Sequence, residues 1–228
     1  MSTILITGAN RGIGLELTRQ WADEGHRVFA TCRHPESAAE LNELAGDRVT
    51  VHRLDVTEPG QLGQLEDELG DTAIDILVNN AGVYGPRDRQ SFGSLDYDDW
   101  ADVLRVNVFG PVRVTEALLP RVERSEGKKI ATVSSRMGSI ADSSGGSYIY
   151  RSSKAAVNCV MHGLAEELGG RGVVVLALHP GWVQTDMGGD SALITAEESA
   201  RGLRRVIEGA GPSDSGRFLN WKGEELPW

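Results

Sequence analysis

Apolar and polar positions follow two different periods along this chain. Short, nearly unbroken apolar runs, the first at residues 3–7, predict strands that are buried on both faces. Between these runs, apolar residues recur at helical spacing, as with Ile13, Leu17 and Trp21 in the segment 12–25, which stops at a glycine. The pattern therefore predicts strands that alternate with amphipathic helices.

The same two periods divide the whole chain into elements. Strands are predicted at 3–7, 27–32, 48–56, 128–135 and 216–220, within 74–82, where the strand runs into a turn, and within 173–183, where it ends in a Pro-Gly turn. Helices are predicted at 12–25, 36–46, 60–70, 97–125, 150–170 and 195–209, with Gly110 and Pro111 bending the long one without ending it. Six strand–helix units predict an α/β, doubly wound Rossmann fold, in which one parallel sheet of about seven strands has helices on both faces. No linker or repeat divides the chain, so residues 1–228 are expected to form a single domain.

Composition and charge narrow the classes of partner. The chain has 228 residues, of which 40% are hydrophobic, and its formal net charge is -10. This charge disfavours a nucleic-acid partner, because phosphate binding needs clustered Lys and Arg. No basic amphipathic run and no stretch of about 18 apolar residues indicates a membrane. A strand-like run from Thr3 leaves no room for a secretory signal, so a cytoplasmic protein is expected.

Cysteines and histidines give no metal-binding pattern. Cys32 and Cys159 lie far apart and outside any CxxC motif, which is typical of reduced thiols. The five histidines are scattered, and none stands at metal-ligand spacing from a Cys, Asp or Glu. We therefore expect no metal site.

A glycine-rich turn, ITGANRGIG at 6–14, follows the first predicted strand and opens the first predicted helix. Gly8 permits a tight turn, Gly12 lets the backbone approach a phosphate, and Gly14 allows close packing of helix on strand. The free N–H groups and the positive dipole end of the helix would then face the anion. The spacing differs from the commoner G-x-G-x-x-G, and no Gly-Lys-Ser/Thr follows. On spacing and context alone, a dinucleotide site therefore competes with a plain strand–helix turn.

Two tyrosines precede one of only four lysines in the chain, in SYIYRSSK at 147–154. Tyr150 and Lys154 stand four residues apart and share one face of the predicted helix. Tyr148 has Ser152 at that spacing and is placed in the loop before the helix. A nearby ammonium favours the phenolate form of a tyrosine, whose ordinary pKa is about 10. The same spacing is found in solvent-facing helical pairs, so the pair alone does not identify a site.

Taken together, the motifs resemble the short-chain dehydrogenase/reductase family over essentially the whole chain. They occur in order as TGANRGIG at 7–14, LDV at 54–56, NNAG at 79–82, Asn107, VSS at 133–135, YRSSK at 150–154 and PGWVQT at 180–185. The resemblance implies that Tyr150 is the acid and base of a carbonyl–alcohol reaction, with Lys154 as its helper. It also implies that Asn107 and Ser135, the first residue of SRMG, complete the catalytic group.

Two of these candidates keep a second interpretation. The resemblance implies that Asn107 holds a water that connects to Lys154. The alternative is that this mid-helix asparagine forms a hydrogen bond that bends its own helix, and both can hold. Ser135 ends the fifth predicted strand, where doubly wound sheets place their ligands. Its neighbour Ser134 points the opposite way and is assigned to backbone hydrogen bonding.

The resemblance further implies a cofactor site, and two arginines indicate NADP(H). NAD sites usually carry an acidic residue about 20 residues after the glycine turn, but Arg33 stands there, and Arg11 lies within the turn. Guanidinium groups suit a 2′-phosphate, although ordinary surface arginines would give the same pattern. The expected cofactor-binding residues are Gly8, Asn10, Arg11, Gly12, Ile13, Gly14, Arg33, Asp55, Val56, Asn80, Ala81, Gly82, Tyr150, Lys154, Pro180, Gly181, Val183 and Thr185.

Finer features, including HPGWVQTDMGG at 179–189 and NWKGEELPW at 220–228, resemble the Sniffer-type carbonyl reductases and the C-factor-like signalling proteins of this family. We therefore expect an NADP(H)-dependent oxidoreductase that interconverts a small-molecule carbonyl and an alcohol. A signalling or regulatory protein that binds the dinucleotide is the alternative. The resemblance also implies a homodimer or homotetramer, packed through the helices predicted at 97–125 and 150–170.

Overall fold

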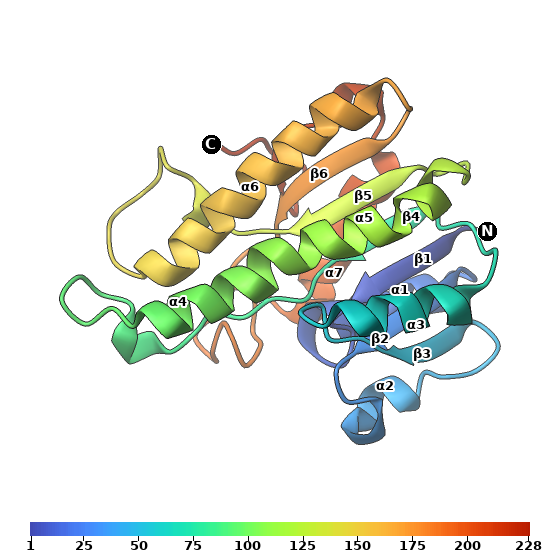
Figure 1. The fold of residues 1–228 in the computed structure, drawn as a ribbon, viewed down its shortest axis with the longest axis horizontal. Coiled ribbons are helices and arrows are strands. Elements are labelled where there is room, and N and C mark those ends of the chain that lie inside the picture. Colours follow the sequence, from blue (N-terminus) through green and yellow to red (C-terminus); the bar gives the residue numbers. More distant parts are fainter.

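Seven parallel strands form one sheet in the computed structural model, which describes all 228 residues (Figure 1). The strands are β1 (Thr3–Thr7), β2 (Arg27–Cys32), β3 (Val49–Arg53), β4 (Ile76–Asn79), β5 (Lys129–Val133), β6 (Val174–His179) and β7 (Phe218–Asn220). Their order across the sheet is β3-β2-β1-β4-β5-β6-β7. The chain winds outward from β1 to β3 and then returns to β4 on the other side of β1. The carboxyl ends of β1 and β4 therefore flank the point where the strand order reverses.

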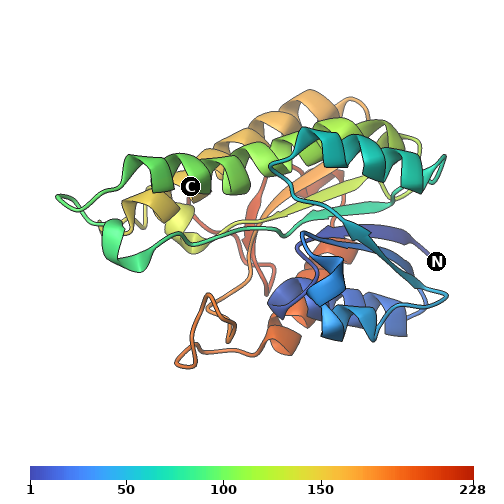
Figure 2. The ribbon, with the colours of Figure 1, turned by 60° about the horizontal axis from the view of Figure 1, so that its bottom comes forward.

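Helices cover both faces of the sheet, which gives three layers (Figure 2). One face carries α3 (Pro59–Leu69), α4 (Tyr97–Leu104), α5 (Gly110–Glu123) and α6 (Tyr148–Gly169), and the other carries α1 (Gly12–Asp23), α2 (Ala39–Asn42) and α7 (Ala196–Gly209). The predicted doubly wound fold with seven strands is confirmed. None of the helices combines the length and the apolar character that crossing a membrane requires.

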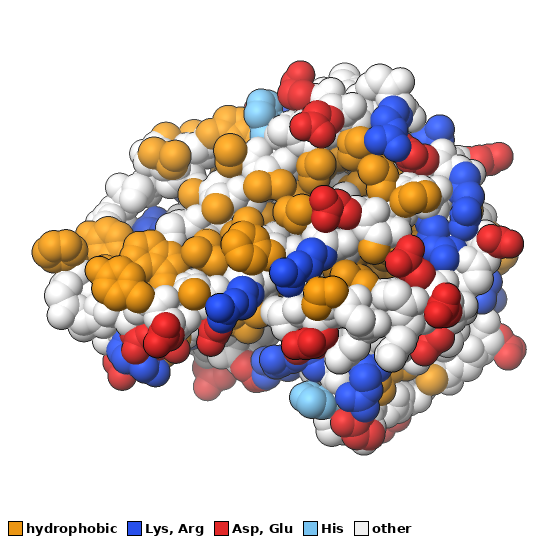
Figure 3. All heavy atoms as spheres, in the orientation of Figure 1, with side chains coloured by type: hydrophobic (Ala, Val, Ile, Leu, Met, Phe, Trp, Pro, Cys, Tyr) orange, Lys and Arg blue, Asp and Glu red, His pale blue; other side chains and the backbone are white.

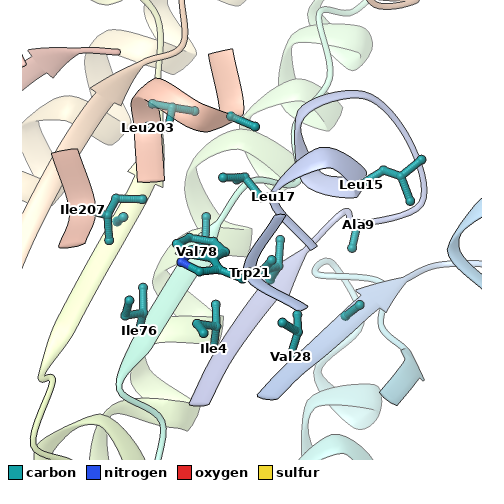
Figure 4. Packing of buried hydrophobic residues seen from close by; sticks show 14 of the residues in the cluster. Ile4, Ala9, Leu15, Leu17, Trp21, Val28, Ile76, Val78, Leu203 and Ile207 are labelled. Atoms are coloured by element: carbon teal, nitrogen blue, oxygen red, sulfur yellow. The ribbon is translucent and has the colours of Figure 1, made fainter. Parts of the chain in front are cut away.

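Two apolar clusters hold the layers together, one on each face of the sheet. Along β1, Ile4 and Ile6 belong to the cluster under α1 and α7, whereas Leu5 belongs to the cluster under α3, α5 and α6. Trp21 lies in the middle of the first cluster (Figure 4), is fully buried, and donates its indole N–H to Glu208 of α7. Because both faces of each central strand are covered, successive apolar residues are all buried, which explains the unbroken apolar runs in the sequence.

The long helix predicted at 97–125 continues through a π-helical turn. α4 leads into this turn, Arg105–Phe109, and α5 follows without a break. Pro111 has no N–H to donate to the carbonyl of Asn107, four residues earlier, so the α-helical hydrogen bond is lost at that point. The helix therefore changes its winding just before Gly110 and Pro111 but does not end there, as predicted.

Two predicted boundaries next to β3 are wrong. The helix predicted at 36–46 is reduced to a 3-10 turn at Pro35–Ser37 and the single turn of α2, because the chain then has to turn back to start β3. The strand predicted at 48–56 ends at Arg53. The residues that follow leave the sheet, and the carboxylate of Asp55 accepts hydrogen bonds from the backbone and side chain of the second residue after it.

The placement of Tyr148 is also corrected. α6 begins at Tyr148, so this residue lies in the first turn of the helix and not in the preceding loop. Ser147, the residue before it, has a φ of +48°, in the left-handed region. That conformation reverses the chain direction just before Tyr148. The helix therefore starts two residues before residue 150, the start predicted from the sequence.

Candidate active site

A cleft of about 640 Å³ opens at the carboxyl edge of the sheet, over the ends of β1 and β4. It is lined by the glycine turn, the end of β2, the segment after β3, the turn after β4, the first turns of α6 and the segment after β6. Loops from strands on the two sides of the reversal point run in opposite directions, which leaves room for a ligand between them.

Close backbone contacts form the floor of the cleft. Gly8 has a φ of +66°, and a Cβ on it would lie 2.9 Å from the Cα of Ala81. A Cβ on Gly14 would lie 2.4 Å from the carbonyl oxygen of Gly8 and 2.5 Å from Nδ2 of Asn80. The start of α1 therefore packs directly on the strand ends. No side chain caps this helix, so its first N–H groups and positive dipole end remain available to an anion.

Tyr150 and Lys154 both border the cleft, although their side chains are almost fully buried, with exposed fractions of 7% and 5%. Nζ of Lys154 lies 5.7 Å from the centre of the Tyr150 ring and donates a hydrogen bond to the carbonyl of Val133 at 3.0 Å. Burial lowers the pKa of Lys154 to about 8. Burial also raises the pKa of Tyr150 to about 12, with the Ser135 side chain acting in the opposite direction. At neutral pH the pair is therefore a phenol beside an ammonium.

The two serines after β5 make different contacts. Ser135 starts a 3-10 turn, and its hydroxyl accepts a hydrogen bond from the backbone of that turn at 3.1 Å. Ser134 donates its backbone N–H to the carbonyl of Leu178 at 2.7 Å, and its hydroxyl lies 3.5 Å from the carbonyl of Lys154. Ser134 thus serves backbone hydrogen bonding, and Ser135 is the serine that influences Tyr150.

Asn107 is buried in the π-helical turn and joins the segment after β4 to helix α6. Its Oδ1 accepts from the N–H of Val83 at 2.9 Å, while its Nδ2 donates to the carbonyl of Val83 at 2.8 Å and to Oγ of Ser153 at 3.0 Å. None of these partners is in its own helix, so the helix-bending interpretation is wrong. The side chain fixes the turn after β4 against α6. A Cβ on Gly82, in that turn, would lie 3.5 Å from Nζ of Lys154.

The two arginines of the 2′-phosphate prediction have different surroundings. Arg33 borders the cleft at the end of β2, where its guanidinium has no carboxylate partner, although Glu40 lines the same end. Arg11 forms an exposed ion pair with Asp186, on the segment after β6. Arg33 is therefore a free cation at one end of the cleft, whereas Arg11 links its two sides.

The cleft gathers most of the residues predicted from the sequence. Those that line it are Gly8, Asn10, Arg11, Gly12, Ile13, Arg33, Asp55, Val56, Asn80, Ala81, Gly82, Tyr150, Lys154, Pro180 and Thr185. The predicted residues that do not line it are Gly14, Asn107, Ser135, Gly181 and Val183. Gly14 and Asn107 still shape it, because each holds a lining segment in place from below.

Two residues of the loop between β4 and α4 contact Tyr150 and are not among the catalytic and cofactor-binding residues predicted from the sequence. The ring of Tyr84 lies on the ring of Tyr150, with centroids 4.6 Å apart, and its hydroxyl forms a hydrogen bond with Ser147 at 2.8 Å. Gln90 is 2% exposed and accepts a hydrogen bond from the backbone N–H of Tyr150. The position of Tyr84, two residues after the NNAG motif, is a sequence signal for a place near the site. No sequence signal distinguishes Gln90 from the other polar residues of PRDRQ at 86–90.

A histidine and two glutamates outside the cleft come together, which the spacing of the sequence did not indicate. Ligand atoms of Glu24, His26 and Glu208 lie within 4.8 Å of one another. Each side chain already has a partner, since Glu24 pairs with Arg204, His26 accepts from the backbone of Ser2, and Glu208 accepts from the Trp21 indole. The cluster is explained by these contacts between α1 and α7.

Comparison with known proteins points to one family. The family model of the short chain dehydrogenases matches residues 2–193. The C-signal protein of Myxococcus xanthus is 47% identical over 156 residues, which cover 68% of this chain and 93% of that protein.

Solved structures agree with this match over the full length. The carbonyl reductase Sniffer of D. melanogaster has a TM-score of 0.92 and 31% identity, with 100% of both chains covered. The NADPH-bound carbonyl reductase from chicken fatty liver also has a TM-score of 0.92, with 32% identity over 100% of this chain and 99% of that one. The predicted resemblance to both branches is confirmed.

The close packing of α1 on the strand ends can be tested with one methyl group. We expect Gly14→Ala to destabilise the fold by about 1–3 kcal/mol, the usual range for overpacking a buried position. The matched control is Gly163→Ala on α6, where nothing lies within 4 Å of an added Cβ. That change should stabilise by about 0.5–1 kcal/mol, because alanine is the better helix former. Urea unfolding measures both values, and a Gly14→Ala protein as stable as the wild type would contradict the packing.

Proposed function

The chain belongs to the short-chain dehydrogenase family, and we propose that it is an NADP(H)-dependent oxidoreductase that interconverts a carbonyl compound and an alcohol. The observation that carries the proposal is the buried Tyr150–Lys154 pair beside a cleft whose floor is a glycine turn. The likeness to an NADPH-bound carbonyl reductase over the full length of the chain supports the choice of cofactor.

The shape of the cleft fits a dinucleotide. The turn has no side chain at Gly8 or Gly12, and the uncapped start of α1 faces the same space, which suits a pyrophosphate. By family resemblance, Asp55 and Val56 lie beside the adenine and Thr185 beside the nicotinamide, and all three line the cleft. NADPH, when bound, supplies the hydride.

Tyr150 is the proposed proton donor. Its raised pKa, about 12, keeps the phenol protonated at neutral pH, as donation to the oxygen of a carbonyl substrate requires. The nearby ammonium of Lys154 favours the phenolate that remains after the proton has left. Ser135, next to Tyr150, is the proposed second donor to the substrate oxygen. The ligand-free site is thus set for reduction, and alcohol oxidation needs further stabilisation of the phenolate.

Asn107 has an indirect role in this proposal. Its side chain holds the backbone of Val83 and thereby keeps the adjacent turn next to Lys154. Pro111 cannot donate to the carbonyl of Asn107, and this carbonyl is the proposed site for a water that connects to Lys154. Such a water would pass protons between Lys154 and solvent.

A signalling or regulatory role is the second candidate, because the C-signal protein is 47% identical over two thirds of the chain. The two roles are compatible, since the same cleft would hold the dinucleotide in either. A carbonyl panel assayed by NADPH absorbance separates them. Binding of NADPH without turnover of any carbonyl would favour the signalling role.

The cytoplasmic location and the single-domain organisation stay predictions.

The assignment of the two tyrosines is tested by Tyr150→Phe. Loss of the phenol hydroxyl should lower kcat by about 10²–10⁴-fold, the usual contribution of an acid–base group. The affinity for NADPH, measured by fluorescence titration, should stay near that of the wild type. Tyr148→Phe in the same helical turn is the matched control and should retain most of the activity. An inactive Tyr148→Phe beside an active Tyr150→Phe would reverse the assignment.

Cofactor preference is tested at Arg33. The charge-assisted bond of a guanidinium to a 2′-phosphate contributes about 1.5–3 kcal/mol, so Arg33→Asp should lower the ratio of kcat/KM for NADPH over NADH by at least about tenfold. Arg11→Ala should lower the ratio less, because Asp186 already holds that guanidinium. An unchanged ratio in Arg33→Asp, or a wild type that is equally efficient with NADH, would refute the proposed preference.

We propose a homodimer or homotetramer that packs through α4, α5 and α6. Apolar side chains gather over these helices in Figure 3. The large apolar residues that are exposed here include Tyr97 on α4, Phe109 in the π-helical turn and Tyr148 on α6. Light scattering should give twice or four times the chain mass for the wild type and a smaller mass for Phe109→Glu. Leu193→Glu, an equally apolar exposed site on the segment after β6, is the control and should not change the mass. A monomeric wild type would refute this assembly.

A further inference from the structure

The first turn of α6 carries Tyr150 but lacks an ordinary cap. The first N–H groups of any helix have no partner within the helix, and a Ser, Thr, Asp or Asn at the preceding position usually accepts one of them. Ser147 stands at that position, but its left-handed backbone directs the side chain elsewhere, and its hydroxyl forms a hydrogen bond with Tyr84. The local residue therefore does not hold the start of the helix.

Gln90 takes over this function from a separate loop. Its backbone carbonyl accepts from the N–H of Tyr148 at 3.0 Å, and its side-chain Oε1 accepts from the N–H of Tyr150 at 2.9 Å. Its side-chain Nε2 donates to the carbonyl of Tyr84 at 2.9 Å. The exposed fraction of Gln90 is 2%, so its amide is shielded from water, and both the oxygen and the nitrogen of the amide have a hydrogen-bond partner.

We propose that Gln90 is a positioning residue for Tyr150, holding the backbone of this tyrosine and the Tyr84 ring against it in one fixed arrangement. The inference rests on the proposed function, because it concerns the tyrosine that is assigned there as the proton donor. Gln90 itself touches neither the substrate nor the phenol oxygen. It acts on Tyr150 from the side of the backbone.

The geometry shows why one amide can matter for the chemistry. Lys154, one turn later, is held by Val133 of β5. The backbone N–H of Tyr150 is bonded to Gln90 and not to β5, so the loop that carries Gln90 contributes to its position relative to Ser135. The same amide fixes the carbonyl of Tyr84, whose ring lies 4.6 Å from that of Tyr150. Proton transfer is sensitive to displacements of about 1 Å, which can cost about 10²-fold in rate.

Two substitutions separate the contacts of Gln90. Gln90→Met keeps the length of the side chain but removes both amide bonds. Gln90→Glu keeps the oxygen that accepts from Tyr150 and replaces the donor to Tyr84 by a second oxygen. Gln20→Leu is the matched control, because it removes a side-chain amide bond to the carbonyl of Glu197 between α1 and α7, far from this helix start.

Hydrogen exchange of the cofactor-free protein tests the cap directly. In Gln90→Met, the amide of Tyr150 should exchange at least about tenfold faster than in the wild type, while the rest of α6 is unchanged. Gln90→Glu should protect the Tyr150 amide nearly as well as the wild type. Gln20→Leu should leave this amide unaffected. Equal protection in Gln90→Met and the wild type would overturn the proposal, as would a Gln90→Glu protein that exchanges as fast as Gln90→Met.

Kinetics then test the consequence for Tyr150. Gln90→Met should lower kcat by about 10- to 100-fold, while the Kd for NADPH changes by less than about twofold. A purely structural role would lower cofactor binding together with kcat, so parallel losses would overturn the proposal. A wild type that turns over no carbonyl would instead refute the proposed function. If Gln90→Met does not fold, Gln90→Glu decides, because a kcat and Tyr150 protection close to the wild type support the cap and a loss of both refutes it.

Discussion

The burial of the Lys154 ammonium is the constraint around which this site is arranged. A charged group that is 5% exposed is costly unless polar groups replace its water, and the carbonyl of Val133 does so in part. This bond requires α6 to lie close to the end of β5. Gly138 meets the requirement, because a Cβ there would lie 2.7 Å from the carbonyl carbon of Lys154. Because Gly138 has no side chain, α6 can lie close enough for Lys154 to reach the carbonyl of Val133.

The same burial moves two pKa values in opposite chemical senses. It makes the ammonium of Lys154 easier to deprotonate and the phenol of Tyr150 harder to ionise, so burial moves the pKa values of the two groups apart. Pairs of titratable groups that a shared environment tunes in this way are typical of acid–base sites. The neutral phenol beside the ammonium therefore follows from desolvation together with the four-residue spacing on one helix.

The two ends of the cleft are held by different physical means. At the glycine turn, close backbone packing fixes an uncapped helix start, whose N–H groups stay available to an anion. On the opposite side, the segment after β6 is attached by exposed contacts, namely the Arg11–Asp186 pair and a hydrogen bond from Arg87 to the carbonyl of Met187. Exposed ion pairs contribute little to stability, so these two contacts across the cleft add little to the stability of the fold.

The sequence by itself determined the doubly wound fold, the glycine turn and the Tyr150–Lys154 pair, because each is encoded by short-range spacing. Only the tertiary structure decided which separate segments meet. It brought the side chain of Gln90 to the backbone N–H of Tyr150, 60 residues away in the chain, and it gave Arg11 a carboxylate partner 175 residues away. It also moved Tyr148 from a loop into the helix and reduced the helix predicted at 36–46 to a single turn. Periodicity and turn motifs act over a few residues, whereas the partner of a loop side chain depends on how layers pack, and no local pattern records that.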